Sequence, residues 1–157
     1  MKALFPGTFD PFHNGHLKIA KRAASIFDCL VIGVAVQTGK NTLCHKIRAR
    51  LISDCTAEIK NIEVKFFDGL TTDFAVQIGA NVIVRGIRNG QDAEYEKTAS
   101  AIYRHLAPQI EVVCLITDQD IPISSTLIRQ LIKANADISA FIPAQIKDKI
   151  IDIYSKL

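Results

Sequence analysis

The sequence predicts an α/β protein: a doubly wound sheet of about five parallel strands, with helices on both faces and a C-terminal helical segment. Short apolar runs rich in β-branched residues alternate with longer runs whose apolar residues recur at helical spacing. The 157 residues are 48% hydrophobic and 22% charged, a balance that favours a packed core over disorder. No repeat or linker interrupts this pattern, so we expect residues 1–157 to form one Rossmann-like domain.

The expected strands are short and apolar, which suits strands that are buried on both faces of a sheet. In chain order they are expected at residues 2–5, 30–36, 62–67, 81–84 and 111–116.

The expected helices lie between and after these strands. Leu17, Ala20, Ala24 and Phe27 recur at the spacing of one helix face, which predicts a helix over 15–27. Further helices are expected over 46–59, 72–78 and 92–106, from near Ser125, and at the C-terminus with Pro143 in its first turn. Ligands of such sheets bind beyond the carboxyl ends of the strands, so residues that follow strands are the candidates for chemistry.

Composition narrows the class of protein. The net charge of +3 is too small to indicate nucleic acid as a partner, although it allows a local basic pocket. The longest apolar run, 29–36, is far shorter than the ~20 residues of a membrane helix, and MKALFPG is too short for a signal peptide. The four cysteines form no CxxC pair, which favours reduced thiols in a cytoplasmic protein. Cys29 and Cys114 lie in apolar runs and are expected in the core.

The stretch PGTFDPFHNGH, residues 6–16, follows the first expected strand and precedes the first helix. Asn14 is a good residue to cap that helix, and free N–H groups at a helix start attract phosphate. The ring N–H groups of His13 and His16 are placed to point at the same anion, and Thr8 adds a hydroxyl beside Gly7. The alternative is that the two histidines are ordinary surface residues.

Three other post-strand positions offer groups that bind anions. Lys40 follows the second strand, and its alternative is a solvated surface lysine. Arg85 and Arg88 follow the fourth strand, where guanidinium groups suit phosphate oxygens; their alternative is an ion pair with a nearby acidic residue, Asp92, Glu94 or Glu96. Ser124 or Ser125 is expected to cap the next helix, whose start would face the same ligand.

The His13-Asn14-Gly15-His16 motif resembles the signature of the nucleotidyltransferase superfamily. Three segments extend the resemblance to the phosphopantetheine adenylyltransferase family over nearly the whole chain: PGTFDPxxNGH at the start, RGxRxxxDxEYE over 85–96, and ISST over 123–126. The resemblance implies transfer of the adenylyl group of ATP to 4′-phosphopantetheine, which yields dephospho-CoA and pyrophosphate in coenzyme A biosynthesis. It also implies Mg²⁺ bound with ATP, a homohexamer and CoA as an inhibitor.

The resemblance also implies roles for individual residues. The catalytic residues would be His16, Lys40 and Arg88. The ATP-binding residues would be Thr8, Phe9, His16, Arg88, Glu96, Ser124, Ser125 and Thr126. The acceptor would be bound by Thr8, Lys40, Thr71 and Arg85, and no residue is expected to ligate a metal.

Other functions stay open at this point. One is nucleotidyl transfer to a different phosphate acceptor, such as nicotinate mononucleotide. Another is a nucleotide-binding module without turnover, although the presence of His16, Lys40, Arg85 and Arg88 favours an enzyme. A flavodoxin-like electron carrier is disfavoured because the post-strand loops are basic and carry a histidine pair.

Overall fold

The computed structural model describes residues 1–36, 43–117 and 123–156. Within them, one five-stranded sheet is formed by β1 (Lys2–Gly7), β2 (Cys29–Ala35), β3 (Ile62–Phe67), β4 (Val82–Ile87) and β5 (Glu111–Ile116). All neighbouring strands pair in parallel, in the order β3-β2-β1-β4-β5. The predicted fold class is confirmed.

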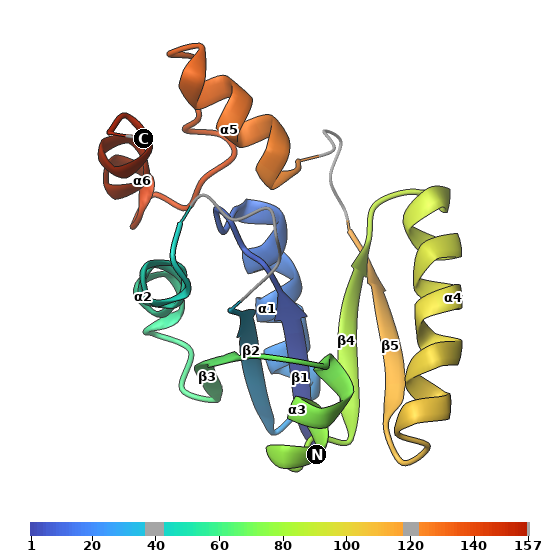
Figure 1. Cartoon of the computed structure of the whole chain (residues 1–157). Coiled ribbons are helices and arrows are strands. Elements are labelled where there is room, and N and C mark those ends of the chain that lie inside the picture. The colour runs from blue at the N-terminus through green and yellow to red at the C-terminus, as the bar shows by residue number, and fades with distance from the viewer. Residues whose placement is uncertain (37–42, 118–122, 157) are drawn as a thin grey trace.

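Helices connect the strands and continue beyond the last one. They are α1 (Asn14–Ile26), α2 (His45–Thr56), α3 (Thr71–Gln77), α4 (Gly90–Leu106), α5 (Ser125–Lys133) and α6 (Lys147–Tyr154). Figure 1 shows α4 beside β5 at one side of the molecule, and α5 and α6 beyond the carboxyl ends of the strands. These two C-terminal helices therefore stand at the edge of the sheet where ligands of such folds bind.

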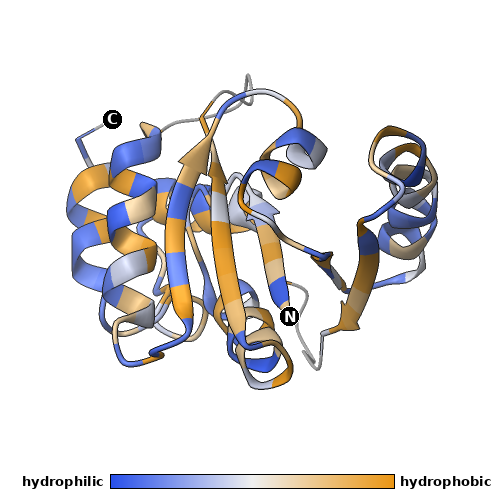
Figure 2. Cartoon of the chain, turned by 90° about the horizontal axis from the view of Figure 1, so that it is seen from below, coloured by the Kyte–Doolittle hydropathy of each residue, from blue (hydrophilic) through white to orange (hydrophobic). Residues whose placement is uncertain are grey.

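Alternating side chains of the central strands build a separate core on each face of the sheet. In β1, Phe5 belongs to the core shared with α1, α2, α5 and α6, whereas Leu4 belongs to the core shared with α3. The strand Cys29–Ala35 alternates in the same way, with Ile32 on the first face and Val31 on the second. Figure 2 shows these apolar strands between helices whose polar residues face outward. Burial on both faces explains why the strands read as continuous apolar runs.

Several elements differ at their ends from the expected ranges; β1, for example, continues to Gly7. β4 continues through Arg85 to Ile87, so Arg85 lies within the strand and pairs with Cys114. Helix α2 ends at Thr56, three residues before the expected end. Pro143 precedes α6, and its carbonyl accepts from Ile146 in a turn, so the proline is outside the helix.

The cysteine expectation also needs correction. Cys114 is exposed and Cys29 is only half-buried, because β5 is an edge strand and Cys29 begins β2. Cys55 on α2 is the buried thiol among the described residues, and burial raises its pKa to about 12. None of the helices in the described residues combines the length and the apolar composition that a membrane span requires.

Candidate active site

The two histidines of the first loop form the start of α1. His13 is the N-cap: its Nδ1 accepts from the backbone N–H of His16, while Nδ1 of His16 accepts from the backbone N–H of His13, both at 3.3 Å. The reciprocal pair is a capping box built from two imidazoles. Asn14, the expected cap, is instead the first residue of the helix, and its side chain donates to the carbonyl of Ala140 at 3.0 Å.

This arrangement fixes the tautomer of both rings. Because each Nδ1 accepts a hydrogen bond, each neutral ring carries its proton on Nε2 and can donate from there. The rings stack with centroids 3.6 Å apart. Burial, followed by the positive charge of Arg88, lowers the pKa of His13 to about 3. Burial, followed by His13, Arg88 and Arg85, lowers the pKa of His16 well below its usual value. Both imidazoles are therefore neutral hydrogen-bond donors at physiological pH.

Phe9 supports this pair from within the loop. Its φ of 53° is in the left-handed region, which is uncommon for a residue with a side chain and is often found at functional sites. The ring is buried and meets the His16 ring edge to face, with centroids 4.9 Å apart. The ring also lies against Gly7, and a Cβ atom added at position 7 would come within 2.7 Å of the ring. Position 7 thus requires glycine because of close approach.

The guanidinium of Arg85 bonds groups on two other elements, Glu96 on α4 and Pro6 on β1. Its Nε and Nη2 donate to the same oxygen of Glu96, at 2.9 and 2.6 Å, and its Nη1 donates to the carbonyl of Pro6 at 3.2 Å. The other carboxylate oxygen, Oε2 of Glu96, is buried and has no protein partner. Since a buried polar atom without a partner is costly, this oxygen is suited to accept a hydrogen bond from a ligand.

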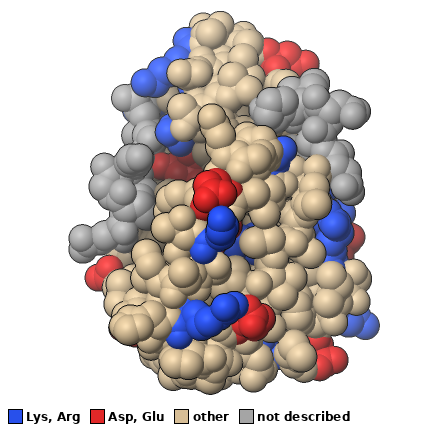
Figure 3. Space-filling view, turned by 90° about the vertical axis from the view of Figure 1, so that its right-hand side faces the viewer, with Lys and Arg blue, Asp and Glu red and all other residues tan. Residues whose placement is uncertain are grey.

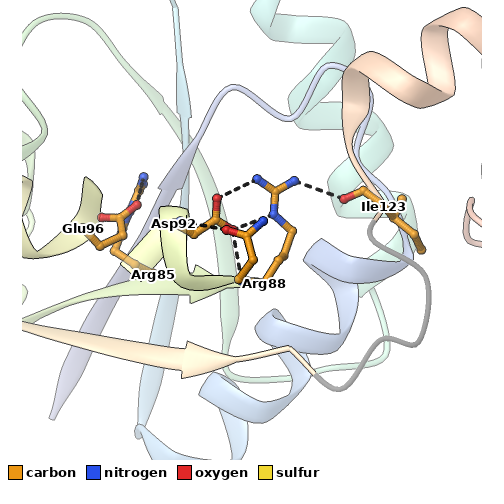
Figure 4. Close-up of polar contacts among 6 residues, drawn as sticks. Arg85, Arg88, Asp92, Glu96 and Ile123 are labelled. Carbon is orange, nitrogen blue, oxygen red and sulfur yellow. Dashed lines mark hydrogen bonds and ion pairs between the residues drawn. The ribbon is translucent and has the colours of Figure 1, made fainter. Parts of the chain in front are cut away.

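Arg88 is held by the helix that follows it. Nε and Nη2 donate to the two oxygens of Asp92 at 2.8 and 3.1 Å, and Nη1 donates to the carbonyl of Ile123 at 3.3 Å (Figure 4). These bonds hold the pKa of Asp92 below its usual value. The ion-pair alternative is thus observed for both arginines. A guanidinium has five N–H donors, and each of these two uses three in the bonds described, which leaves two N–H groups of each for other partners.

A cleft of about 340 Å³ joins these groups. The predicted site residues that line it are Phe9, His13, His16, Arg85, Arg88, Glu96, Ser124 and Ser125. Ser124 caps α5 by accepting from the N–H of Leu127 at 3.2 Å, which confirms one of the two expected caps. The cleft walls do not include Thr8, Thr71 or Thr126, and Lys40 lies outside the described residues. Segments more than one hundred residues apart in sequence therefore share one cavity at the sheet edge.

Sequence reasoning missed several residues at and behind this cleft. Tyr95 and Thr117 line it. Behind the loop, Arg48 is only 1% exposed, and its Nε and Nη2 donate to the carbonyls of Leu43 and Ala35, both at 2.9 Å. The third donor group, Nη1, bonds the carbonyl of Thr8. The only sequence signal for the buried role of Arg48 was an arginine within a helix of mixed charge. Such arginines are common in solvated helices, so this signal is not diagnostic.

Carboxylates in the described part of the chain do not gather into a metal-binding cluster of three or more ligands. In the cleft, Asp92 is in an ion pair with Arg88, and one oxygen of Glu96 is in an ion pair with Arg85. The side chains described here thus do not form a protein cage for Mg²⁺, an ion that commonly keeps several waters and binds through substrate phosphates.

The fold and the cleft suit a nucleotidyltransferase, and comparison with known proteins identifies this class. Residues 4–131 match the family model described as Cytidylyltransferase-like. A crystal structure named "Putative Nicotinate-nucleotide Adenylyltransferase", from Vibrio parahaemolyticus, superposes with a TM-score of 0.74 at 18% identity, covering 99% of this chain and 96% of that one. At this identity the likeness shows the fold alone.

Sequence relatives are more specific. A phosphopantetheine adenylyltransferase of Desulfitobacterium hafniense (strain Y51) is 40% identical over 97% of this chain and 94% of its own length. One of Bacteroides thetaiotaomicron is 44% identical over 90% of this chain and 95% of its own length. The chain belongs to the phosphopantetheine adenylyltransferase family of the cytidylyltransferase-like proteins.

Proposed function

We propose that this protein transfers the adenylyl group of ATP to 4′-phosphopantetheine, which gives dephospho-CoA and pyrophosphate, a step of coenzyme A biosynthesis. One observation carries the proposal: two neutral imidazoles, two arginines and the start of α5 line a single cleft at the carboxyl edge of the sheet. Relatives named for this activity, which align with nearly the whole chain, support the choice of acceptor.

The reaction suits a site without a base-activated nucleophile. A phosphate oxygen of the acceptor attacks the α-phosphorus of ATP, a new P–O bond forms, and the bond from the α-phosphorus to the bridging oxygen of pyrophosphate breaks. A phosphate monoester has a second pKa near ~6, so the attacking group is already largely dianionic at neutral pH. The protein has to bring two anions together and stabilise the charge that develops at phosphorus.

The neutral histidines fit that task. The Nε2–H of His16 is proposed to donate to an α-phosphate oxygen, a bond that strengthens as negative charge grows in the transition state. A neutral donor whose Nδ1 is held by the backbone keeps its proton throughout, so no proton transfer needs to accompany the step. His13, stacked 3.6 Å away, presents a second Nε2–H beside it.

Each of the two arginines is proposed to bind a different substrate. Arg85 would hold the acceptor phosphate, and Arg88, with the α5 start at Ser124 and Ser125, would hold the β- and γ-phosphates of ATP. Both guanidinium groups are fixed by carboxylates, so their free N–H groups are oriented before the ligand arrives. Acceptor roles for Thr8, Lys40 and Thr71, and ATP-binding roles for Phe9, Glu96 and Thr126, stay predictions.

We further propose that Mg²⁺ enters with ATP, held by its phosphates and by water, and neutralises part of the phosphate charge. The free Oε2 of Glu96 is the one described carboxylate oxygen in the cleft that is buried without a partner, and it can accept from a nucleotide hydroxyl or from a bound water. A cytoplasmic location and inhibition by CoA are also proposals, which rest on the family resemblance.

A homohexamer is proposed as the assembly, and the exposed side of α4 offers support. Among the residues of α4, only Glu96 is buried, while Tyr95, Ile102 and Leu106 are 51–68% exposed. Ile116 of the edge strand β5 is exposed as well. Figure 3 views this side and shows a mostly uncharged surface with scattered charges. Exposed apolar side chains of this kind favour association. Light scattering of the purified protein tests the assembly.

The function is tested by pyrophosphate release from ATP with each candidate acceptor. We expect release with 4′-phosphopantetheine and at most a trace with nicotinate mononucleotide. Release with nicotinate mononucleotide alone would assign the chain to a different acceptor. ATP binding without release for any acceptor would make it a nucleotide-binding module.

A further inference from the structure

The loop that carries the two histidines is bonded through its backbone to donors on a later helix. The carbonyl of Asp10 accepts from Nη1 of Arg129, and that of Pro11 accepts from Oγ of Ser125 at 2.9 Å. Both donors lie on α5. The backbone of the loop is thus positioned by residues more than one hundred positions later in the chain.

The side chain of Asp10 adds a link to the last helix. Asp10 is 1% exposed, and its Oδ1 accepts a hydrogen bond from the hydroxyl of Tyr154, in the last turn of α6. Arg48, also 1% exposed, is attracted electrostatically to Asp10 and bonds the carbonyl of Thr8. A buried carboxylate needs such partners, because without them its desolvation is strongly unfavourable.

The location of Asp10 connects this link to the chemistry. Asp10 follows Phe9, whose ring touches His16, and precedes His13 by three residues. A displacement of Asp10 would therefore displace the loop residues that hold the two imidazole rings in position. Catalysis is sensitive to displacements of about 1 Å, which can cost on the order of 10²-fold in rate.

We propose that Tyr154 is a positioning residue: by bonding Asp10 it ties helix α6 to the histidine loop, so that full turnover requires the C-terminal helix in place. The proposal rests on the adenylyl transfer proposed above. Tyr154 does not line the cleft, so it acts through Asp10 and not by touching a substrate. It also gives α6 a role that its distance from the motifs in sequence does not suggest.

The test compares Tyr154→Phe with a matched control, Ile150→Val. Phenylalanine keeps the ring and removes only the hydroxyl. Ile150 lies one turn earlier on α6 and is fully buried, so valine loosens the packing of the same helix but leaves the bond to Asp10 intact. Both variants are assayed as the full chain by pyrophosphate release, below their melting temperatures. Long-range ¹H–¹⁵N spectra of ¹⁵N-histidine-labelled protein report on the two imidazoles without substrate, at low temperature where destabilised variants stay folded.

We expect Tyr154→Phe to lower kcat about tenfold with less than about a threefold change in KM for ATP, and to shift the resonances of His13 and His16. Ile150→Val is expected to lower the melting temperature while kcat and the histidine spectra stay as in the wild type. The proposal is overturned by a Phe variant with wild-type kcat and spectra, or by a valine variant that loses as much kcat. A wild type that releases no pyrophosphate overturns the proposed function instead, and the spectra then still decide whether Tyr154 positions the loop.

Discussion

Acid should destabilise this protein through the histidine pair, and the size of the effect follows from the fold. His13 is 5% exposed, and its pKa falls from 6.5 to about 3 on folding, because burial and the charge of Arg88 oppose protonation. Below pH ~6.5 the unfolded chain therefore binds a proton at this position that the folded chain does not. Stability from this source is fully present above pH ~6.5 and is lost as the pH falls toward the folded pKa.

One proton of difference changes the unfolding free energy by about 1.4 kcal/mol per pH unit. Between pH ~6.5 and ~4.5 the loss from His13 alone is thus about 3 kcal/mol, a large part of the ~5–15 kcal/mol that typical domains have. His16, whose pKa is lowered in the same direction, adds to this loss.

The assay is urea unfolding, followed by circular dichroism at several pH values between ~7.5 and ~4.5, on the wild type and on His13→Asn. Asparagine keeps an oxygen that can cap α1 but does not titrate. We expect the variant to lose stability less steeply, by about 1.4 kcal/mol per pH unit. Parallel curves for the two proteins would show that the pKa of His13 does not fall on folding, and would refute the claim that burial and Arg88 oppose its protonation.

Three other substitutions test the site and its support. His16→Ala should lower turnover about 10²–10³-fold with an unchanged circular dichroism spectrum, since one transition-state donor is lost; turnover close to wild type would remove the proposed role. Arg88→Lys cannot keep the fork to Asp92, so kcat/KM for ATP should fall about 10–100-fold, and an unchanged value would place the β- and γ-phosphates elsewhere. Arg48→Met leaves buried carbonyls without donors and should cost about 3 kcal/mol or more in urea unfolding. Arg50→Met, exposed on the same helix, should change stability by less than about 0.5 kcal/mol, and equal effects would contradict the buried role of Arg48.

The cleft was largely predictable because its residues lie at or beyond the carboxyl ends of strands. His13 and His16, Arg85 and Arg88, and the serines at the start of α5 all come after or near the ends of predicted strands, and a parallel sheet brings these ends to one edge. The error was in their partners: the sequence favoured free arginines, whereas each is paired with a carboxylate. Both carboxylates are near in sequence, but helical spacing leaves more than one choice of partner.

The sequence by itself determined the alternation of strands and helices, since apolar periodicity is local and each element buries its own face. It also predicted an anion site after the first strand, because the motif there is contiguous. Only the tertiary structure decided that the side chain of Asn14 bonds the carbonyl of Ala140 while His13 caps α1, and that Tyr154 bonds Asp10. The physical reason is that hydrogen bonds between buried groups distant in sequence depend on how the helices pack, and no local pattern records that packing.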